Sequence, residues 1–322
     1  MENNVLLNGN PNEQKKNSME NISDGMMRFN RVKPIANIGY SALFIFLALL
    51  CILPVIFVII ISFTSESSIG QYGYSFFPHE WSITAYEYVW NMKSIVGRAL
   101  LNSIFITIVG TAIGLVLTST MGYCLSRKNY KCRKFFTYYI FIPMLFHGGL
   151  LASYVVNTQI LMLKDTYWVL ILTTCCSSFY VIILRTFFTT TIPDELIESG
   201  KIDGASQLRI FIQLVLPISL PALATIGLFL TFSYWNEWYI ASIYLSTSRT
   251  DLFPLQYVLV SIEQKIQFLL NNANYMSADA QDLPSETMRM AIVVIAVVPI
   301  MFSYPFFQKY YISGLTIGAV KG

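Results

Sequence analysis

The sequence predicts an all-α integral membrane protein, and two observations carry this prediction. Hydrophobic residues make up 55% of the 322 residues, charged residues make up only 12%, and the mean hydropathy is +0.55. A soluble domain carries about 25% charged residues. The apolar residues also gather in six runs, each long enough to cross about 30 Å of hydrocarbon as a helix. The net charge of +3 is small and gives no indication of nucleic-acid binding.

The six runs predict six transmembrane helices, because charged residues stop at their edges. The second run contains no Asp, Glu, Lys or Arg and lies between Arg98 and Arg127, the fourth is closed by Arg185, and the sixth lies between Arg289 and Lys309. A charge at a helix centre costs about 2.5–3.5 kcal/mol on insertion scales. The expected spans are 38–63, 99–126, a part of 135–163, 166–184, a part of 218–245, and 290–308.

Basic residues predict the orientation of these spans. Five lysines and arginines lie within residues 1–33, and five more lie within 127–134. Both segments should face the cytoplasm, which places the two termini and the loop 192–217 on the cytoplasmic side of the membrane. Residues 1–34 are polar and Asn-rich, and we expect a disordered cytoplasmic arm rather than a cleaved signal peptide. The five cysteines have no metal-ligand spacing, and no disulfide or metal site is expected.

Two long loops should lie outside the cell. Residues 64–97 and 248–286 are acidic, and the second loop is longer than a plain connector needs. They are either passive connectors or contacts for another protein. Residues 248–286 are the candidate for such a contact, since the stretch Asn271–Asn274 looks polar and flexible.

The loop 192–217 contains an acidic, structured segment between two apolar runs, and its spacing predicts a helix, a turn and a second helix. Pro193 is suited to the first helical position, where its missing N–H costs little. Gly200 is expected to help end this helix, and Asp203 to cap the next one. Pro217 is expected to limit the second helix or to mark its entry into the membrane.

This segment resembles the "EAA" loop of permease subunits of bacterial ABC importers. The three parts of the family pattern correspond to Glu198–Gly200, Asp203–Ala205 and Leu214–Pro217. Ser199 and Gly200 replace the usual alanines but remain small. The resemblance implies the type I importer permease (MetI-like) fold over residues 35–312, with a cytoplasmic tail at 313–322. The alternative is an ordinary cytoplasmic helical hairpin.

A second resemblance narrows the family. The segments Tyr310–Gly322, Phe146–Leu150, Tyr234–Trp238 and Met288–Ala291 are similar to carbohydrate-importer permeases of the MalG type, in the branch named after LplC and YtcP. This implies an oligosaccharide cargo, with uronate residues in some members. It also implies a second homologous permease, two ATPase subunits, an extracytoplasmic sugar-binding protein and contact with membrane lipid.

The resemblance assigns the loop to coupling with the ATPase. The chain has no Gly-x-x-x-x-Gly-Lys-Ser/Thr segment for binding phosphates, so no cofactor is expected on it, and ATP and Mg²⁺ belong to the partner. Glu198 is expected to meet a basic group of the partner, although a solvated helix charge is the alternative. The expected coupling residues are Glu195, Glu198, Ser199, Gly200, Asp203, Gly204 and Ala205.

Aromatic and polar residues suggest a substrate path. Sugars bind through their C–H faces on aromatic rings and through their hydroxyls on amides or carboxylates. Aromatic residues at the level of the lipid headgroups are the alternative explanation. Arg98, Arg289 and His147 would offset the charge of an acidic cargo, but anchoring of the span ends explains the two arginines equally well. The candidates are Tyr154, Asn157 and His147, with Tyr234, Trp235, Asn236, Glu237 and Trp238.

The main alternative function is a secondary transporter or an integral membrane enzyme that is not coupled to an ATPase. A secondary transporter would show inverted repeats and intramembrane carboxylates, and only Glu237 is a candidate for such an acid. An enzyme would need a nucleophile beside a base. The only histidines are His79 and His147, which the predicted topology places far apart. An importer subunit without enzymatic activity is therefore the favoured function.

Overall fold

The computed structural model describes residues 34–146, 148–271, 285–303, 305 and 308, and every regular element among them is a helix. The chain divides into two compact units, residues 1–57 and 58–322. The described part of the first unit belongs to helix α2 (Pro34–Ser62), whose apolar side chains are mostly exposed. Exposed leucine, isoleucine and phenylalanine from Ile38 to Ile59 suit a surface that faces lipid.

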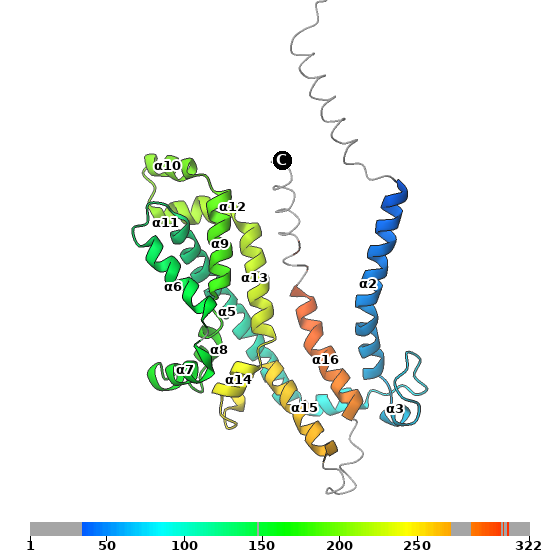
Figure 1. The fold of residues 1–322 in the computed structure, drawn as a ribbon. Coiled ribbons are helices and arrows are strands. Elements are labelled where there is room, and N and C mark those ends of the chain that lie inside the picture. Colours follow the sequence, from blue (N-terminus) through cyan, green and yellow to red (C-terminus); the bar gives the residue numbers. More distant parts are fainter. Residues whose placement is uncertain (1–33, 147, 272–284, 304, 306–307, 309–322) are drawn as a thin grey trace, which may run out of the picture. The chain divides into compact units, whose positions relative to one another are not determined.

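The second unit contains the other helices (Figure 1). Those before the loop 192–217 are α3 (Glu66–Tyr72), α4 (Thr84–Asn91), α5 (Lys93–Ser126), α6 (Arg133–Leu145), α7 (Gly149–Val155), η1 (Val156–Ile160), α8 (Tyr167–Leu172) and α9 (Ser178–Thr191). Those within and after it are α10 (Asp194–Ile202), α11 (Gln207–Ile210), η2 (Phe211–Val215), α12 (Leu216–Ile218), α13 (Leu220–Trp235), α14 (Tyr239–Tyr244), η3 (Thr250–Leu252), α15 (Leu255–Asn271) and α16 (Ser285–Met301).

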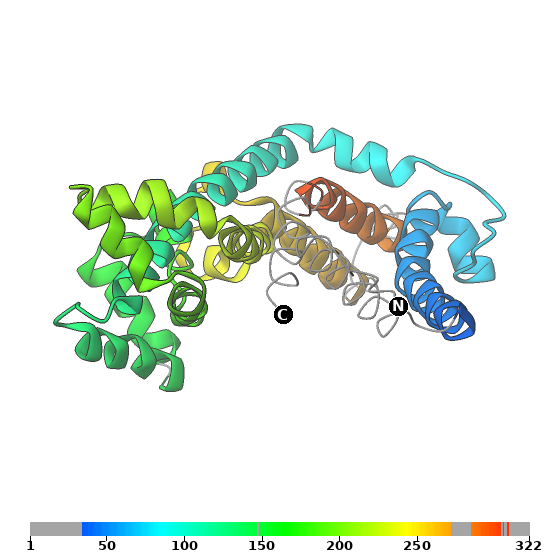
Figure 2. The same ribbon diagram turned by 90° about the horizontal axis from the view of Figure 1, so that it is seen from above.

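Helix α5 is the centre of the second unit, because it makes its most extensive contacts with α9 and α13. Figures 1 and 2 show α9 and α13 running side by side. Close packing against α13 depends on Gly110, where a Cβ atom would collide with the ring of Tyr234. The largest cluster of buried apolar side chains joins α5, α8, α9, α13 and α14 to the loop helices α10 and α11. The loop therefore belongs to the same packed core as the long helices.

The expectation of six unbroken spans is only partly met. By length and composition, 36–62 and 93–126 are long and apolar enough to cross a membrane. Two helix pairs in the described chain would bring the number to four if each pair is one span: 133–145 with 149–160, bent by 120°, and 207–218 with 220–235, bent by 82°. The fourth run divides into α8 and α9, and Arg185 lies inside α9 rather than closing the run. The end of the sixth run lies partly outside the described residues.

The loops expected outside the cell are largely helical. Helix α15 occupies 255–271 and packs against α5 and α16, so the expectation of a flexible loop is wrong over that part. The stretch 272–284 lies outside the described residues, as do residues 1–33 and 309–322. Glu66 accepts hydrogen bonds from the backbone N–H groups of Glu286 and Thr287, both at 3.0 Å. The loop 64–97 thereby caps α16 instead of being a passive connector.

Candidate functional site

Helix α10 carries the acidic half of the loop that the sequence singles out. Asp194 and Glu195 lie in its first turn and Lys201 in its last, which complements the helix dipole. Ile197 is buried in the core, whereas Glu195 and Glu198 are exposed. The helix begins directly after Pro193, so this proline precedes the first turn instead of lying inside it. One face of α10 is thus fixed to the protein and the other presents carboxylates.

The turn after α10 differs in two details from the sequence prediction. The N–H of Ala205 donates to the carbonyl of Gly200 and the N–H of Gly204 to that of Lys201, both at 3.0 Å. This pair of bonds is a Schellman motif, and Gly204 occupies its left-handed position with φ 77°. Gly204, rather than Gly200, therefore ends the helix. Asp203 closes α10, and Ser206 caps α11 by accepting a hydrogen bond from the N–H of Arg209 at 3.3 Å.

Small residues serve different purposes on this element. Gly200 is buried inside α10, where an added Cβ atom would lie 3.1 Å from Ile210 Cγ1 and 3.3 Å from Leu214 Cδ1. Ala205 is half-buried against the core. Ser199 faces outward, and its Oγ donates to the carbonyl of Leu196 at 3.0 Å. Close packing of α10 on the following helix thus depends on Gly200, and Ser199 belongs to the exposed face.

Substitution of Gly204 by alanine is expected to loosen the turn. A side chain in the left-handed region costs about 1–2 kcal/mol. Asparagine tolerates this conformation better, so Gly204→Asn should be milder. Thermal unfolding of the purified protein measures the effect. Gly70→Ala is the matched control, because nothing lies within 4 Å of the added Cβ and no positive φ is involved. A melting temperature that Gly204→Ala leaves unchanged would contradict the role of this turn.

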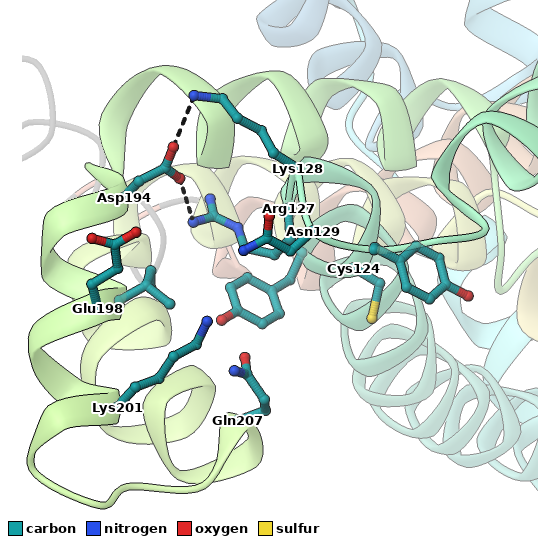
Figure 3. Close-up of a pocket in the computed structure, with 11 residues that line it drawn as sticks. Cys124, Arg127, Lys128, Asn129, Asp194, Glu198, Lys201 and Gln207 are labelled. Carbon is teal, nitrogen blue, oxygen red and sulfur yellow. Dashed lines mark hydrogen bonds and ion pairs between the residues drawn. The ribbon is translucent and has the colours of Figure 1, made fainter.

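Asp194 links α10 to the end of α5. Its carboxylate lies 2.9 Å from Lys128 Nζ and 3.5 Å from Arg127 Nη1 (Figure 3). The hydrogen bond from Lys128 lowers the pKa of Asp194, and Asp194 in turn raises the pKa of Lys128. The Asp194 carboxylate stabilises the fold at pH values above its ordinary pKa. This stabilisation is lost as the pH falls through the lowered pKa. The Lys128 ammonium stabilises the fold at pH values below its ordinary pKa, and this stabilisation is lost as the pH rises through the raised pKa. The carboxylate and the ammonium are therefore both charged near neutral pH.

Arg127 joins three helices at this point. Its side chain is only 13% exposed. Besides facing Asp194, it donates from Nη2 to the carbonyl of Phe188 on α9 at 3.1 Å and from Nε to Ser126 Oγ at 2.9 Å. Its guanidinium lies over the ring of Tyr123, 5.3 Å from the centroid. We call Arg127, Lys128 and Asp194 the α5–α10 clamp. Sequence reasoning used Arg127 and Lys128 only to orient the chain and did not find this clamp.

A cavity of about 500 Å³ separates the end of α5 from α10. Its walls include the clamp, together with Glu198, Lys201 and Gln207 (Figure 3). Within the part of the chain that the structure describes, neither the Glu198 carboxylate nor the Lys201 ammonium takes part in a hydrogen bond or an ion pair. The Glu198 carboxylate is therefore exposed and free to meet a positive group of another molecule. This arrangement can bind a partner that carries a positive charge.

The residues proposed for the substrate path lie around the break between α13 and α14. Tyr234 and Trp235 are buried and donate to the carbonyls of Ile171 and Ala296 at 2.7 and 3.1 Å. Glu237 accepts from the N–H of Ile240 at 2.8 Å at the start of α14. Asn236 is exposed, and Trp238 is 38% exposed. Asn236 Nδ2 also donates to the carbonyl of Phe232 at 3.0 Å, so Asn236 and Trp238 differ from Tyr234 and Trp235 in exposure.

Two other path candidates meet a residue that sequence reasoning missed. The ring of Tyr154 stacks on that of Tyr244 with centroids 5.6 Å apart, and Asn157 Nδ2 donates to the Tyr244 hydroxyl at 3.1 Å. Tyr244 lies at the end of the fifth apolar run, and no sequence signal distinguished it from the other tyrosines. His147 lies outside the described residues. The role of all these residues in a substrate path stays a prediction.

Comparison with known proteins defines the class to which this fold and site belong. Residues 114–316 match the family described as "Binding-protein-dependent transport system inner membrane component", which covers well over half of the chain. A solved structure, described as a bacterial ABC transporter involved in the import of the acidic polysaccharide alginate, aligns with a TM-score of 0.71 at 28% identity. The alignment covers 86% of this chain and 96% of that one. The class is therefore the membrane permease of an ABC transporter, a transport subunit and not an enzyme.

Relatives of known description agree with this class. "Polygalacturonan/rhamnogalacturonan transport system permease protein YtcP" of Bacillus subtilis is 38% identical, over 91% of this chain and 99% of the relative. Protein LplC of the same organism is 37% identical, over 84% of this chain and 90% of the relative. The chain belongs to the family of binding-protein-dependent transport system inner membrane components.

Proposed function

We propose that this permease imports oligosaccharides that carry uronate residues, taking them from an extracytoplasmic binding protein in a step driven by a separate ATPase. The cargo is supported by the relative described for polygalacturonan and rhamnogalacturonan and by the structure described for alginate. The coupling to ATP is supported by one observation above all. Helix α10 presents the carboxylates of Glu195 and Glu198, which have no partner among the described residues, while its other face is packed into the core of the permease.

Coupling follows from the way α10 is held. A helix that is packed into a core moves as a unit with that core. Gly200 allows close contact with Ile210, the Schellman turn fixes the angle to α11, and the clamp joins α10 to α5 and α9. Movement of an ATPase surface bound to Glu195 and Glu198 would therefore reach the long helices. The exposed Ile202, with 86% of its surface accessible, adds an apolar contact to the same proposed docking surface.

The assembly in this proposal contains this chain, a second homologous permease, two ATPase subunits and a binding protein. One docking helix per permease serves one ATPase subunit, so two permeases are needed for a symmetric pair. The outer segment 248–286 is proposed to contact the binding protein, and the tail 313–322 to reach the ATPase. Tyr154, Asn157, Tyr244, Asn236 and Trp238 are proposed to lie along the substrate path.

We also propose six spans with both ends in the cytoplasm. The clamp places the basic segment after α5 beside α10, which agrees with an assignment of both to the same side of the membrane. Cysteines introduced at Tyr130 and Leu270, in a background without native cysteines, test the orientation with an impermeant reagent. Position 270 should react in intact cells and position 130 only after lysis. The opposite pattern would refute the topology.

The function is tested by reconstituting the permeases, the ATPase and the binding protein in proteoliposomes. We expect uptake of radiolabelled oligogalacturonate that requires internal ATP, and hydrolysis that the loaded binding protein stimulates. Omission of the second permease is the control for the composition of the assembly. Accumulation driven by an ion gradient without ATP would instead establish a secondary transporter and overturn the proposal.

A further inference from the structure

A second polar cavity, of about 680 Å³, lies at the end of α5 opposite to the clamp. Its walls come from the start of α5, the start of α8 and the segment 249–252. They include Arg98, Asn102, Tyr167, Trp168, Arg249 and Asp251. Under the proposed topology this cavity faces the outside of the cell. Its volume lies within the 300–1,000 Å³ that is typical of small-molecule sites.

The walls of this outer cavity are fixed by a buried amide. Asn102 is 7% exposed, and its Nδ2 donates to the carbonyls of Asp251 and Phe253 at 2.8 and 3.1 Å. Its Oδ1 accepts from the Tyr167 hydroxyl at 2.8 Å. One residue of α5 therefore holds the start of α8 and the segment after α14 in place. A cavity with walls fixed in this way is preorganised for binding.

The charges around the outer cavity leave one cation without a partner. Arg249 binds Asp251 in a bidentate pair at 3.0 and 3.1 Å. Asp165 accepts hydrogen bonds from the N–H and the Oγ of Ser246 at 2.6 and 2.7 Å, which lower its pKa. Arg98 is exposed, and its side chain makes no hydrogen bond or ion pair within the described residues, although its charge helps to lower the pKa of Asp251. Its planar guanidinium is suited to bidentate binding of a carboxylate.

Trp168 adds an aromatic surface beside this cation. It follows Tyr167 at the start of α8, lines the cavity and is 52% exposed. A sugar ring packs its C–H face on an indole, while a carboxylate on the same sugar pairs with a guanidinium. Anchoring at the membrane interface would by itself explain an exposed tryptophan at this position. It does not explain why the tryptophan shares a polar cavity with an unpaired arginine.

We infer that the outer cavity is a subsite for an acidic sugar, in which Arg98 binds the carboxylate of a uronate residue and Trp168 packs on its ring. This inference rests on the proposed function, since it concerns the cargo of the same importer. It places a specificity-determining contact at the outer face of this subunit, away from the docking surface on α10. Neutral sugars would lose the contact with Arg98.

The test measures binding of trigalacturonate to the purified complete transporter without the binding protein, by equilibrium dialysis. Arg98→Gln should weaken binding about 10-fold, as expected for loss of one charged hydrogen bond. Trp168→Leu should also weaken it, while the methyl ester of the same trisaccharide should bind less tightly to the unaltered transporter and be insensitive to Arg98→Gln. Lys93→Gln is the matched control. It removes a positive charge from the same end of α5, where Lys93 lies over Trp90 and outside the cavity.

Each outcome decides the inference. No saturable binding, equal binding by Arg98→Gln, equal binding of the methyl ester, or an equal loss in Lys93→Gln would overturn it. The basal ATPase rate and the elution profile of each variant show that the complex remains folded. If ATP-driven uptake persists although trigalacturonate does not bind, the subsite is refuted and the proposed function is not. Absence of ATP-driven uptake by the unaltered transporter refutes the proposed function instead.

Discussion

Replacement of Glu198 by lysine is expected to reduce ATP-driven uptake to background while leaving insertion of the permease intact. The carboxylate is exposed, lies on a helix packed into the core, and has no partner among the described residues. If it meets a basic group of the ATPase, removal of a close charge pair costs about 2–5 kcal/mol, and reversal of the charge adds repulsion. Parallel measurement of uptake and ATP hydrolysis in proteoliposomes shows whether coupling or assembly is lost.

Controls separate docking from a general effect of charge. Glu198→Ala should lower uptake less than Glu198→Lys, because it removes attraction without adding repulsion. Glu87→Lys makes the same charge change at an exposed position of α4, outside both proposed docking segments, and should leave coupling unchanged. Normal uptake and normal stimulation of hydrolysis in Glu198→Lys would show that this residue is a solvated helix charge.

The second large effect is expected for Arg127→Ala. This change leaves the carbonyl of Phe188 without its side-chain donor and removes the link between α5, α9 and α10. Loss of a partner for a buried polar group costs about 1–3 kcal/mol. The melting temperature of the permease should fall, and fewer sugars should enter per ATP hydrolysed, because α10 would move without α5.

Lys128→Ala is the matched control for the clamp. Lys128 is 73% exposed in its side chain, and solvent screens an exposed ion pair so strongly that it contributes little to stability. Its loss should therefore change the melting temperature little. Arg127→Lys should restore only part of the coupling, since lysine lacks the guanidinium fork. If Arg127→Ala imports as many sugars per ATP hydrolysed as the unaltered permease, whatever its melting temperature, then the clamp does not take part in coupling.

The sequence could predict the helix, the turn and the second helix of the loop 192–217 because their signals are local. Pro193, the acidic first turn and the small residues after Glu198 indicate a helix and a turn within one short segment. The detail that failed was which glycine ends α10. Gly200 and Gly204 both fit a helix end by type, and only the contact of Gly200 with Ile210 shows that it is needed for packing.

The breaks in the long apolar runs were not predictable in the same way. Hydropathy averaged over a whole run indicates one span across the end of α8 and one across the end of α13, whereas the backbone forms two helices in each place. The clamp, the capping of α16 by Glu66 and the contacts of Asn102 join residues that are far apart in the chain. Such pairings depend on tertiary packing, which a single sequence without aligned relatives does not encode locally.

The central claim is that the exposed face of α10 binds the ATPase, and a photo-crosslinking amino acid at position 198 tests it most directly. In membranes containing the complete transporter, irradiation should join this permease to the ATPase subunit, and mass spectrometry should identify the peptide on the partner. The same amino acid at position 168 should give no such product, because this position lies on α8 at the outer cavity. Absence of an ATPase adduct from position 198 in an assembled, active transporter would contradict the account.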